Sequence, residues 1–196
     1  MKKTITALII STLASLSATA HDVRGAQDAF FDTIASQCGK AFSGVVTEGN
    51  ASDDSWRESE IVLHIRDCDD TVLKMPMHVG DNRSRTFVLT KIDGGLWWQH
   101  DHRHEDGISD KVTMYGGKTT SSGTANRQDF PAGDATKKLF TETGLTVSLT
   151  NTWTFTIEPG DKATYMLTRP GRLFQITFDL TKPVPLPPAA WGYSKD

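Results

Sequence analysis

The chain has 196 residues, of which 37% are hydrophobic and 23% charged, and its formal net charge is −3. An apolar fraction of this size, without a heptad or triplet repeat, excludes collagen-like, coiled-coil and disordered proteins. Acidic residues outnumber basic ones, 24 to 21, which argues against a nucleic-acid-binding surface. This length predicts about one domain.

The first 20 residues have the pattern of a secretory signal peptide. Two lysines precede an apolar stretch from Ile5 to Leu16, and Ala18 and Ala20 place small residues at the −3 and −1 positions of a cleavage site. The apolar stretch is too short for a transmembrane helix, and no later segment reaches 18 consecutive apolar residues. We therefore expect a soluble protein without a transmembrane segment, either periplasmic or secreted.

Only two cysteines occur, Cys38 and Cys68. In an oxidising compartment, two cysteines most simply form one disulfide. A Cys/His metal site would require a CxxC or CxxH spacing, which the chain lacks. We therefore predict a Cys38–Cys68 disulfide.

Hydrophobic periodicity predicts a short amphipathic helix over residues 26–38 and strands after it. Residues 118–126 read as a loop or weak edge strand, and residues 131–140 as one or two helical turns. Turn signals separate the segments in which apolar and polar residues alternate. These segments are 42–46, 61–65, 72–79, 84–92, 96–104, 111–115, 145–157, 163–167 and 174–180.

Crossover helices are missing between these strands, which excludes a parallel α/β fold. Strands linked by hairpins must hide their edges, and closure does so. We predict an all-β fold, an antiparallel up-and-down β-barrel of about eight to ten strands with a short N-terminal helix; a two-sheet sandwich is the alternative. The expected divisions are a signal peptide (1–20), the N-terminal helix region (21–40), the barrel domain (41–181) and a Pro-rich C-terminal tail (182–196), with Trp191 as an anchor.

A histidine-rich run ends the strand over residues 96–104. Strand alternation places Leu96, Trp98, His100, His102 and His104 on one face, which begins apolar and therefore points inward. Imidazole nitrogens two residues apart can bind one divalent ion such as Zn²⁺ or Cu²⁺. The alternatives are a polar strand end in solvent and a buried polar network without a ligand.

Other residues suggest a ligand site in the barrel interior. Arg83 and Arg85 flank Ser84 and could bind a carboxylate or phosphate through bidentate hydrogen bonds, or could pair with nearby aspartates. The residues expected to contact a ligand are Trp98, Arg85, His78 and Tyr115.

The segments HVGDNRSRT (78–86), HDHRHEDG (100–107) and VTMYGG (112–117) resemble a family of exported bacterial proteins of unknown function. In architecture the chain is also similar to calycins, the lipocalin-like barrels, although it has Gly39-Lys40-Ala41 where they have Gly-x-Trp. That likeness implies a ligand in the barrel interior.

Gly94, His100 and His102 resemble the start of the first cupin motif. This resemblance implies a metal site held by His100 and His102, although Glu105 follows sooner than the motif requires. A metal-dependent enzyme would use the ion bound by these histidines, with Glu105 as general acid/base. No nucleophile elbow or phosphate-binding loop occurs in the sequence. Three hypotheses therefore stand: an exported barrel that binds a small ligand or metal ion, a metal-dependent enzyme, and an interaction module with a filled core.

Overall fold

The computed structural model describes residues 15–193, with side chains from Gly25 onward. The predicted signal peptide, residues 1–20, therefore lies mostly outside the described residues. The helices are α1 (Ser15–Ala35), η1 (Ala51–Asp53), α2 (Asp54–Arg57), α3 (Asp134–Glu142) and η2 (Thr146–Ser148). The strands are β1 (Lys40–Glu48), β2 (Ile61–Ile65), β3 (Asp67–Cys68), β4 (Val72–Val79), β5 (Asn82–Ile92), β6 (Gly95–His102), β7 (Tyr115–Lys118), β8 (Arg127–Pro131), β9 (Thr152–Glu158), β10 (Lys162–Arg169) and β11 (Arg172–Asp179).

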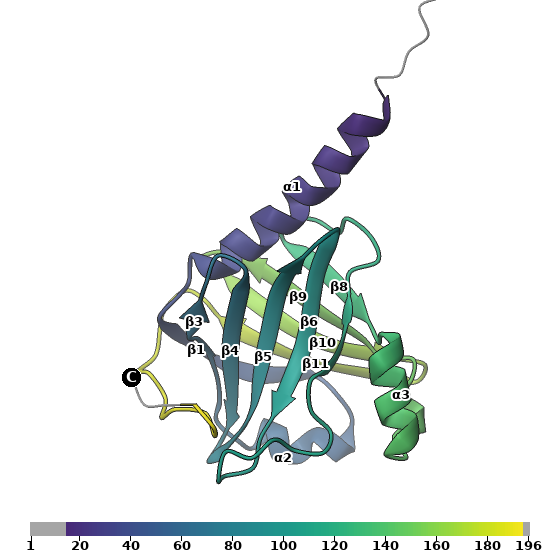
Figure 1. Ribbon diagram of the computed structural model, residues 1–196. Helices are drawn as coiled ribbons and strands as arrows, with labels where there is room; N and C mark the ends of the chain where they lie inside the picture. Colours follow the sequence, from purple (N-terminus) through teal and green to yellow (C-terminus); the bar gives the residue numbers. More distant parts are fainter. Residues whose placement is uncertain (1–14, 194–196) are drawn as a thin grey trace, which may run out of the picture.

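All strands belong to one antiparallel sheet with the order β7-β6-β5-β4-β2-β1-β11-β10-β9-β8, and the two-residue β3 pairs with β4. Almost every neighbour in this order is also a neighbour in sequence, as in an up-and-down meander. The exception is β1 with β11, where Gly44 is opposite Phe178. This pairing joins the first strand to the last and curls the sheet into a nearly closed barrel (Figure 1). The all-β antiparallel barrel is thus confirmed, with slightly more strands than expected.

The barrel is incomplete between β7 and β8, which pair with β6 and β9 but not with each other. Small groups bridge this seam. The Gly133 N–H donates to the Gly116 carbonyl at 3.0 Å, and the Thr136 hydroxyl both accepts from the Gly116 N–H and donates to its carbonyl. A Cβ on Gly117 would lie only 1.8 Å from the Pro131 carbonyl oxygen. The seam therefore requires glycine.

This requirement explains why the sequence pattern failed in the middle of the chain. The Gly116–Gly117 pair reads as a turn, yet both residues lie within β7, where they allow close approach to β6 and β8. The expected strand at 111–115 is irregular until Tyr115, β8 was not anticipated, and the long strand expected from 145 begins only at Thr152. Alternation in 145–149 is interrupted because these residues form the connection containing η2.

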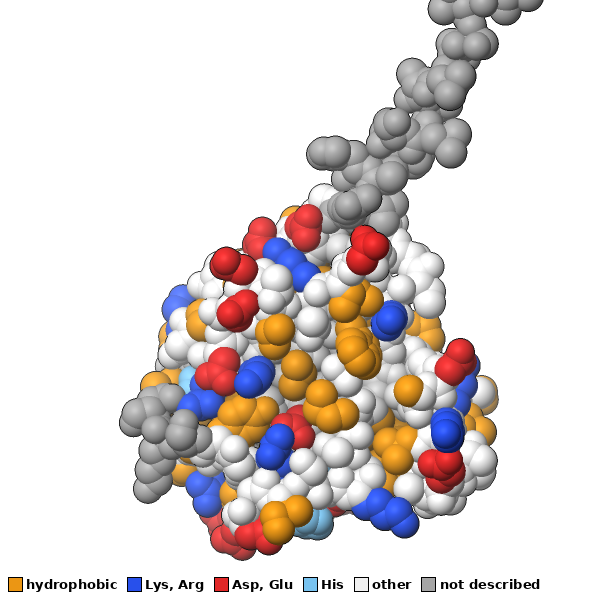
Figure 2. All heavy atoms as spheres, in the orientation of Figure 1, with side chains coloured by type: hydrophobic (Ala, Val, Ile, Leu, Met, Phe, Trp, Pro, Cys, Tyr) orange, Lys and Arg blue, Asp and Glu red, His pale blue; other side chains and the backbone are white. Residues whose placement is uncertain are grey.

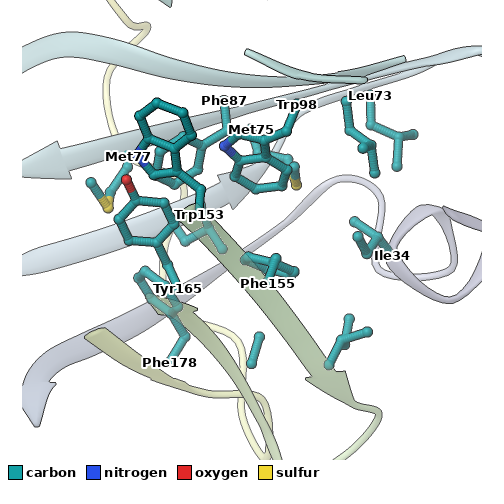
Figure 3. Close-up of a cluster of buried hydrophobic side chains, with 14 of the residues drawn as sticks. Ile34, Leu73, Met75, Met77, Phe87, Trp98, Trp153, Phe155, Tyr165 and Phe178 are labelled. Carbon is teal, nitrogen blue, oxygen red and sulfur yellow. The ribbon is translucent and has the colours of Figure 1, made fainter. Parts of the chain in front are cut away.

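Apolar side chains fill the half of the barrel next to α1. The helix spans Ser15–Ala35, so it begins and ends earlier than the periodicity indicated. Its last turns place Phe30, Phe31 and Ile34 in the hydrophobic core, each at most 1% exposed. In Figure 3, Ile34 lies on one side of the core cluster, while Trp153, Tyr165, Met77 and Phe87 gather on the other.

The Cys38–Cys68 disulfide is present, with the two Cα atoms 6.2 Å apart. It links the turn after α1 to β3, so the helix is covalently attached to the barrel wall. None of the described helices combines the length and hydropathy needed to span a membrane.

The Pro-rich tail runs along the outer wall as far as it is described. Val184 forms a β-bridge with Ala41, and the backbone N–H of Trp191 donates to the Arg83 carbonyl at 3.1 Å. Tyr193 donates its hydroxyl to Asp101, which explains why Asp101 is buried although it points out of the barrel. Elsewhere on the surface, acidic and basic side chains are interspersed with apolar ones, as the face in Figure 2 shows.

Replacing both cysteines with serine should lower the free energy of unfolding by about 3–4 kcal/mol, because the disulfide closes a loop of about 30 residues in the unfolded chain. Urea denaturation of the native and doubly substituted proteins measures this. A reductant should destabilise the native protein and leave the variant unchanged. Equal stability of the two proteins would contradict the prediction.

The seam predicts a contrast between two glycine substitutions. Gly117→Ala should destabilise the protein by about 2 kcal/mol or more, because the new Cβ collides with backbone that cannot move aside. Gly133→Ala is the matched control, since its Cβ would meet no atom closer than 3.7 Å; its stability should change by less than about 1 kcal/mol. Denaturant midpoints compare the two, and a similar cost for both would refute the close approach at Gly117.

Candidate binding cavity

A cavity of about 320 Å³ lies in the barrel at the end that carries α2 and α3, opposite α1 (Figure 1). Its walls come from strand ends that meet there and from the connections between them. The lining residues are Asp53, Trp56, Met77, Arg85, Phe87, His100, His102, Val112, Tyr115, Phe140, Leu145, Ser148, Asn151, Trp153, Tyr165, Leu167, Arg169, Arg172 and Phe174.

Aromatic rings form most of the inner wall. Phe87 stacks on Tyr165 with ring centroids 4.7 Å apart, and His100 stacks on Tyr115 at 4.6 Å. Trp153 lies 5.0 Å from the His100 ring. Packing of this kind fixes the ring orientations, so the inner wall presents a preformed apolar surface.

Hydrogen bonds fix the tautomer of His100. Its Nδ1 lies 3.1 Å from the Tyr115 carbonyl oxygen, which can only accept, so Nδ1 carries the proton. Nε2 is therefore the acceptor, and it receives the Tyr165 hydroxyl at 2.9 Å and the Trp98 indole N–H at 3.4 Å. Burial lowers the pKa of His100 to about 3, and both ring nitrogens of this neutral imidazole are occupied.

His102 and Tyr115 form a second neutral pair at the cavity wall. The Tyr115 hydroxyl lies 3.1 Å from His102 Nε2. Burial and the positive charge of Arg85 lower the pKa of His102 to about 4, while burial raises the pKa of Tyr115 to about 12. Burial also raises the pKa of Tyr165 well above its usual value. At neutral pH these groups therefore offer hydrogen bonds without charge.

An ion pair holds one side of the cavity. Arg172 donates two hydrogen bonds to Asp53, at 2.5 and 2.7 Å, and the Asp53 side chain is only 8% exposed. The bond from Arg172 lowers the pKa of Asp53. Because Asp53 belongs to the connection between β1 and β2, the pair fixes that connection, and with it Trp56, against β11.

Arg85 differs from Arg172 because none of the described side chains is a counter-ion for it. Its guanidinium carbon lies 4.6 Å from the centroid of the Trp56 ring. The Arg85 guanidinium has no hydrogen bond or ion pair with residues 25–193, the part of the chain whose side chains are described. Burial lowers the pKa of Arg85, with Tyr115 and Tyr165 acting in the opposite direction. The third arginine of the lining, Arg169, donates to the neutral Asn151 side chain at 3.2 Å.

The cavity brings together four of the residues singled out in the sequence: Arg85, Tyr115, His100 and His102. Trp98 does not line it, because this fully buried side chain lies behind His100 in the core. Three further residues singled out in the sequence, His78, Arg83 and His104, also lie outside the cavity lining.

His78 and its neighbour Arg83 belong to the outer wall. Met75 and Met77 point into the core, so the alternate residue His78 points outward, and burial lowers its pKa to about 4. Arg83 donates to the Ala189 carbonyl of the tail, so it does not share a ligand with Arg85. The register shift between Met77 and Val79 separates the two arginines.

His104 is exposed beyond the end of β6, with its Nε2 3.8 Å from Asp110. No group of three or more His, Cys, Asp or Glu side chains in the described part of the chain could hold a metal ion. The expected convergence of His100, His102 and His104 on one ion is therefore not found, because His100 uses both ring nitrogens in the core.

Sequence reasoning missed Trp56, Tyr165, Arg169 and the Asp53–Arg172 pair. Tyr165 was recognised only as part of an alternating strand, and the others lie in a connection or at strand ends. Arg169 and Arg172, which flank the Pro170-Gly171 turn, could have indicated a basic rim at a strand end.

Taken together, fold and cavity define a nearly closed antiparallel β-barrel compatible with lipocalin-like architecture, with an internal cavity at one end. Comparisons with protein-family models, curated proteins and solved structures gave no match for this chain.

The buried histidines predict a loss of stability in mild acid. Because the pKa of His100 is about 3 when folded and near 6.5 when unfolded, the unfolded chain binds more protons between these values, so stability falls as pH decreases through this window. From pH 7 to 5, His100 alone should contribute a loss of about 2 kcal/mol. Urea denaturation at both pH values should show a smaller loss for His100→Gln. His104→Gln, at an exposed site just beyond the end of β6, is the control for loss of an imidazole.

Proposed function

We propose that this protein is an exported barrel that binds one small organic molecule in the cavity at its α2–α3 end. The observation that carries the proposal is the combination of an aromatic wall with a cation, Arg85, that lies over Trp56 and has no ion-pair partner among the described side chains. Binding sites for small molecules typically join apolar walls to a few polar groups that orient the ligand.

The size of the cavity supports this function. About 320 Å³ is at the lower end of the usual range for small-molecule sites, roughly 300–1,000 Å³. Small barrels commonly hold one ligand in the interior. In this proposal Arg85 and Tyr115 contact the ligand, whereas Trp98 supports His100 from behind.

Export completes the proposal. Residues 1–20 would be removed as a signal peptide, so that the mature helix begins no earlier than His21. A disulfide is the chemistry expected of a periplasmic or secreted protein. The resemblance to an exported bacterial family supports the same compartment, without indicating an activity.

Metal-dependent catalysis has less support. The two nitrogens of His100 already bond to the Tyr115 carbonyl and the Tyr165 hydroxyl, so metal binding would have to break an existing bond. Glu105, the proposed acid/base, is exposed and does not line the cavity.

Binding can be tested with N-phenyl-1-naphthylamine, a neutral probe whose fluorescence rises in apolar surroundings. The native protein should enhance the emission saturably, with one probe per chain. Ser148→Trp should reduce probe affinity by tenfold or more, because the indole would occupy the cavity that Ser148 lines. Thr150→Trp, exposed in the same connection, is the control and should bind like the native protein. Absence of binding, or equal binding by both variants, would refute the proposal.

A further inference from the structure

The cavity lining is unbalanced in charge. Three arginines face it, Arg85, Arg169 and Arg172, against a single carboxylate, Asp53. Both oxygens of Asp53 accept from Arg172, and one of them also accepts the Asn50 N–H, so within the lining this carboxylate compensates Arg172 and not Arg85 or Arg169. The partner of Arg169 is an uncharged amide. Two positive charges of the lining are therefore uncompensated by the side chains around them.

Of these two, Arg85 is the one built into the aromatic wall. Phe87, the next residue on the same face of β5, stacks on Tyr165, and the Arg85 guanidinium lies over Trp56. Trp56 is itself held by an edge-on contact with Phe174, with ring centroids 5.3 Å apart. A guanidinium stacked through its face keeps its N–H edges available, and those edges match the two oxygens of a carboxylate.

We infer that the ligand is a small aromatic or apolar acid whose single carboxylate is bound by Arg85, an inference that rests on the proposed function of the cavity. Arg85 is partly buried, and a cation in such a position without a counter-ion among the described side chains lowers stability, a cost that a bound carboxylate would offset. The surrounding hydrogen-bonding groups, Tyr115, Tyr165, His100 and His102, are uncharged at neutral pH, so none of them competes as an anion.

The surroundings favour a carboxylate over a phosphate monoester. A phosphate carries up to two charges and three strong acceptor oxygens, which require several donors. Around Arg85 the neighbouring groups are instead Trp56, two tyrosines and two neutral histidines, and the hydroxyls of Tyr115 and Tyr165 are already bonded to His102 and His100. The N–H edge of one guanidinium can bind one carboxylate, and the aromatic walls can pack against the apolar remainder of the same ligand.

The experiment compares two probes of nearly equal shape, naphthalene-2-carboxylate and naphthalene-2-carboxamide, by calorimetric titration of the disulfide-bonded protein at pH 7. The native protein should bind the acid about 10- to 100-fold more tightly than the amide, the range contributed by hydrogen bonds between charged groups. Arg85→Met should abolish this preference, because the acid then loses the charge-assisted hydrogen bonds that distinguish it from the amide.

Two further variants separate geometry from charge. Arg85→Lys keeps the positive charge without the planar fork, so it should retain only part of the preference for the acid. Arg83→Gln removes the same charge two residues away, on the outer wall, and should keep the full preference. Since the Arg85 charge has no ion-pair partner among the described residues, Arg85→Met is expected to fold, and its urea midpoint verifies this.

Equal binding of acid and amide by the native protein would overturn the inference while leaving the proposed binding function intact. A preference that survives in Arg85→Met would overturn the assignment to Arg85. If neither naphthalene compound binds although N-phenyl-1-naphthylamine does, the carboxylate inference fails alone. If none of the three binds, both proposals fail.

Discussion

Pairing of β1 with β11 is the constraint on which the rest of the structure depends. Every other ladder links strands close in sequence and could form in an open meander. The β1–β11 ladder joins segments more than 100 residues apart and turns the meander into a barrel. Because of this closure, side chains as distant as Trp56 and Phe174 meet across one mouth.

The two ends of the barrel then differ in how completely side chains fill them. At one end, Phe30, Phe31 and Ile34 of α1 enter the core and leave little space. At the other, α2 and α3 flank the strand ends without filling them, and the cavity remains. The Cys38–Cys68 bond attaches α1 at the filled end, so the covalent link and the cavity lie at opposite ends of the barrel.

Period-two alternation sufficed to predict the class of fold and the orientation of β6. Leu96 and Trp98 identified the inner face, and His100 and His102 follow them onto it. The cysteine count sufficed for the disulfide. These features depend on local pattern or on composition, which a single sequence displays directly.

The cavity itself could not be predicted, because it depends on contacts between distant segments. Arg83 and Arg85 look equivalent in sequence, and only the irregular register between β4 and β5 sends one to the outer wall and the other to the cavity. Likewise, nothing local indicates that Asp53 meets Arg172, 119 residues later. Alternation predicts a face for each residue, but not its partner.

The unpaired charge of Arg85 has a consequence for the lifetime of the protein. A barrel that keeps an interior cation without a counter-ion is less resistant to unfolding when empty than when occupied, because a ligand that binds only the folded state adds its binding free energy to stability. Proteases cut chains in proportion to the population of open forms when opening is rapid. In the binding function proposed above, ligand supply would therefore affect the rate of proteolysis of this protein as well as its occupancy.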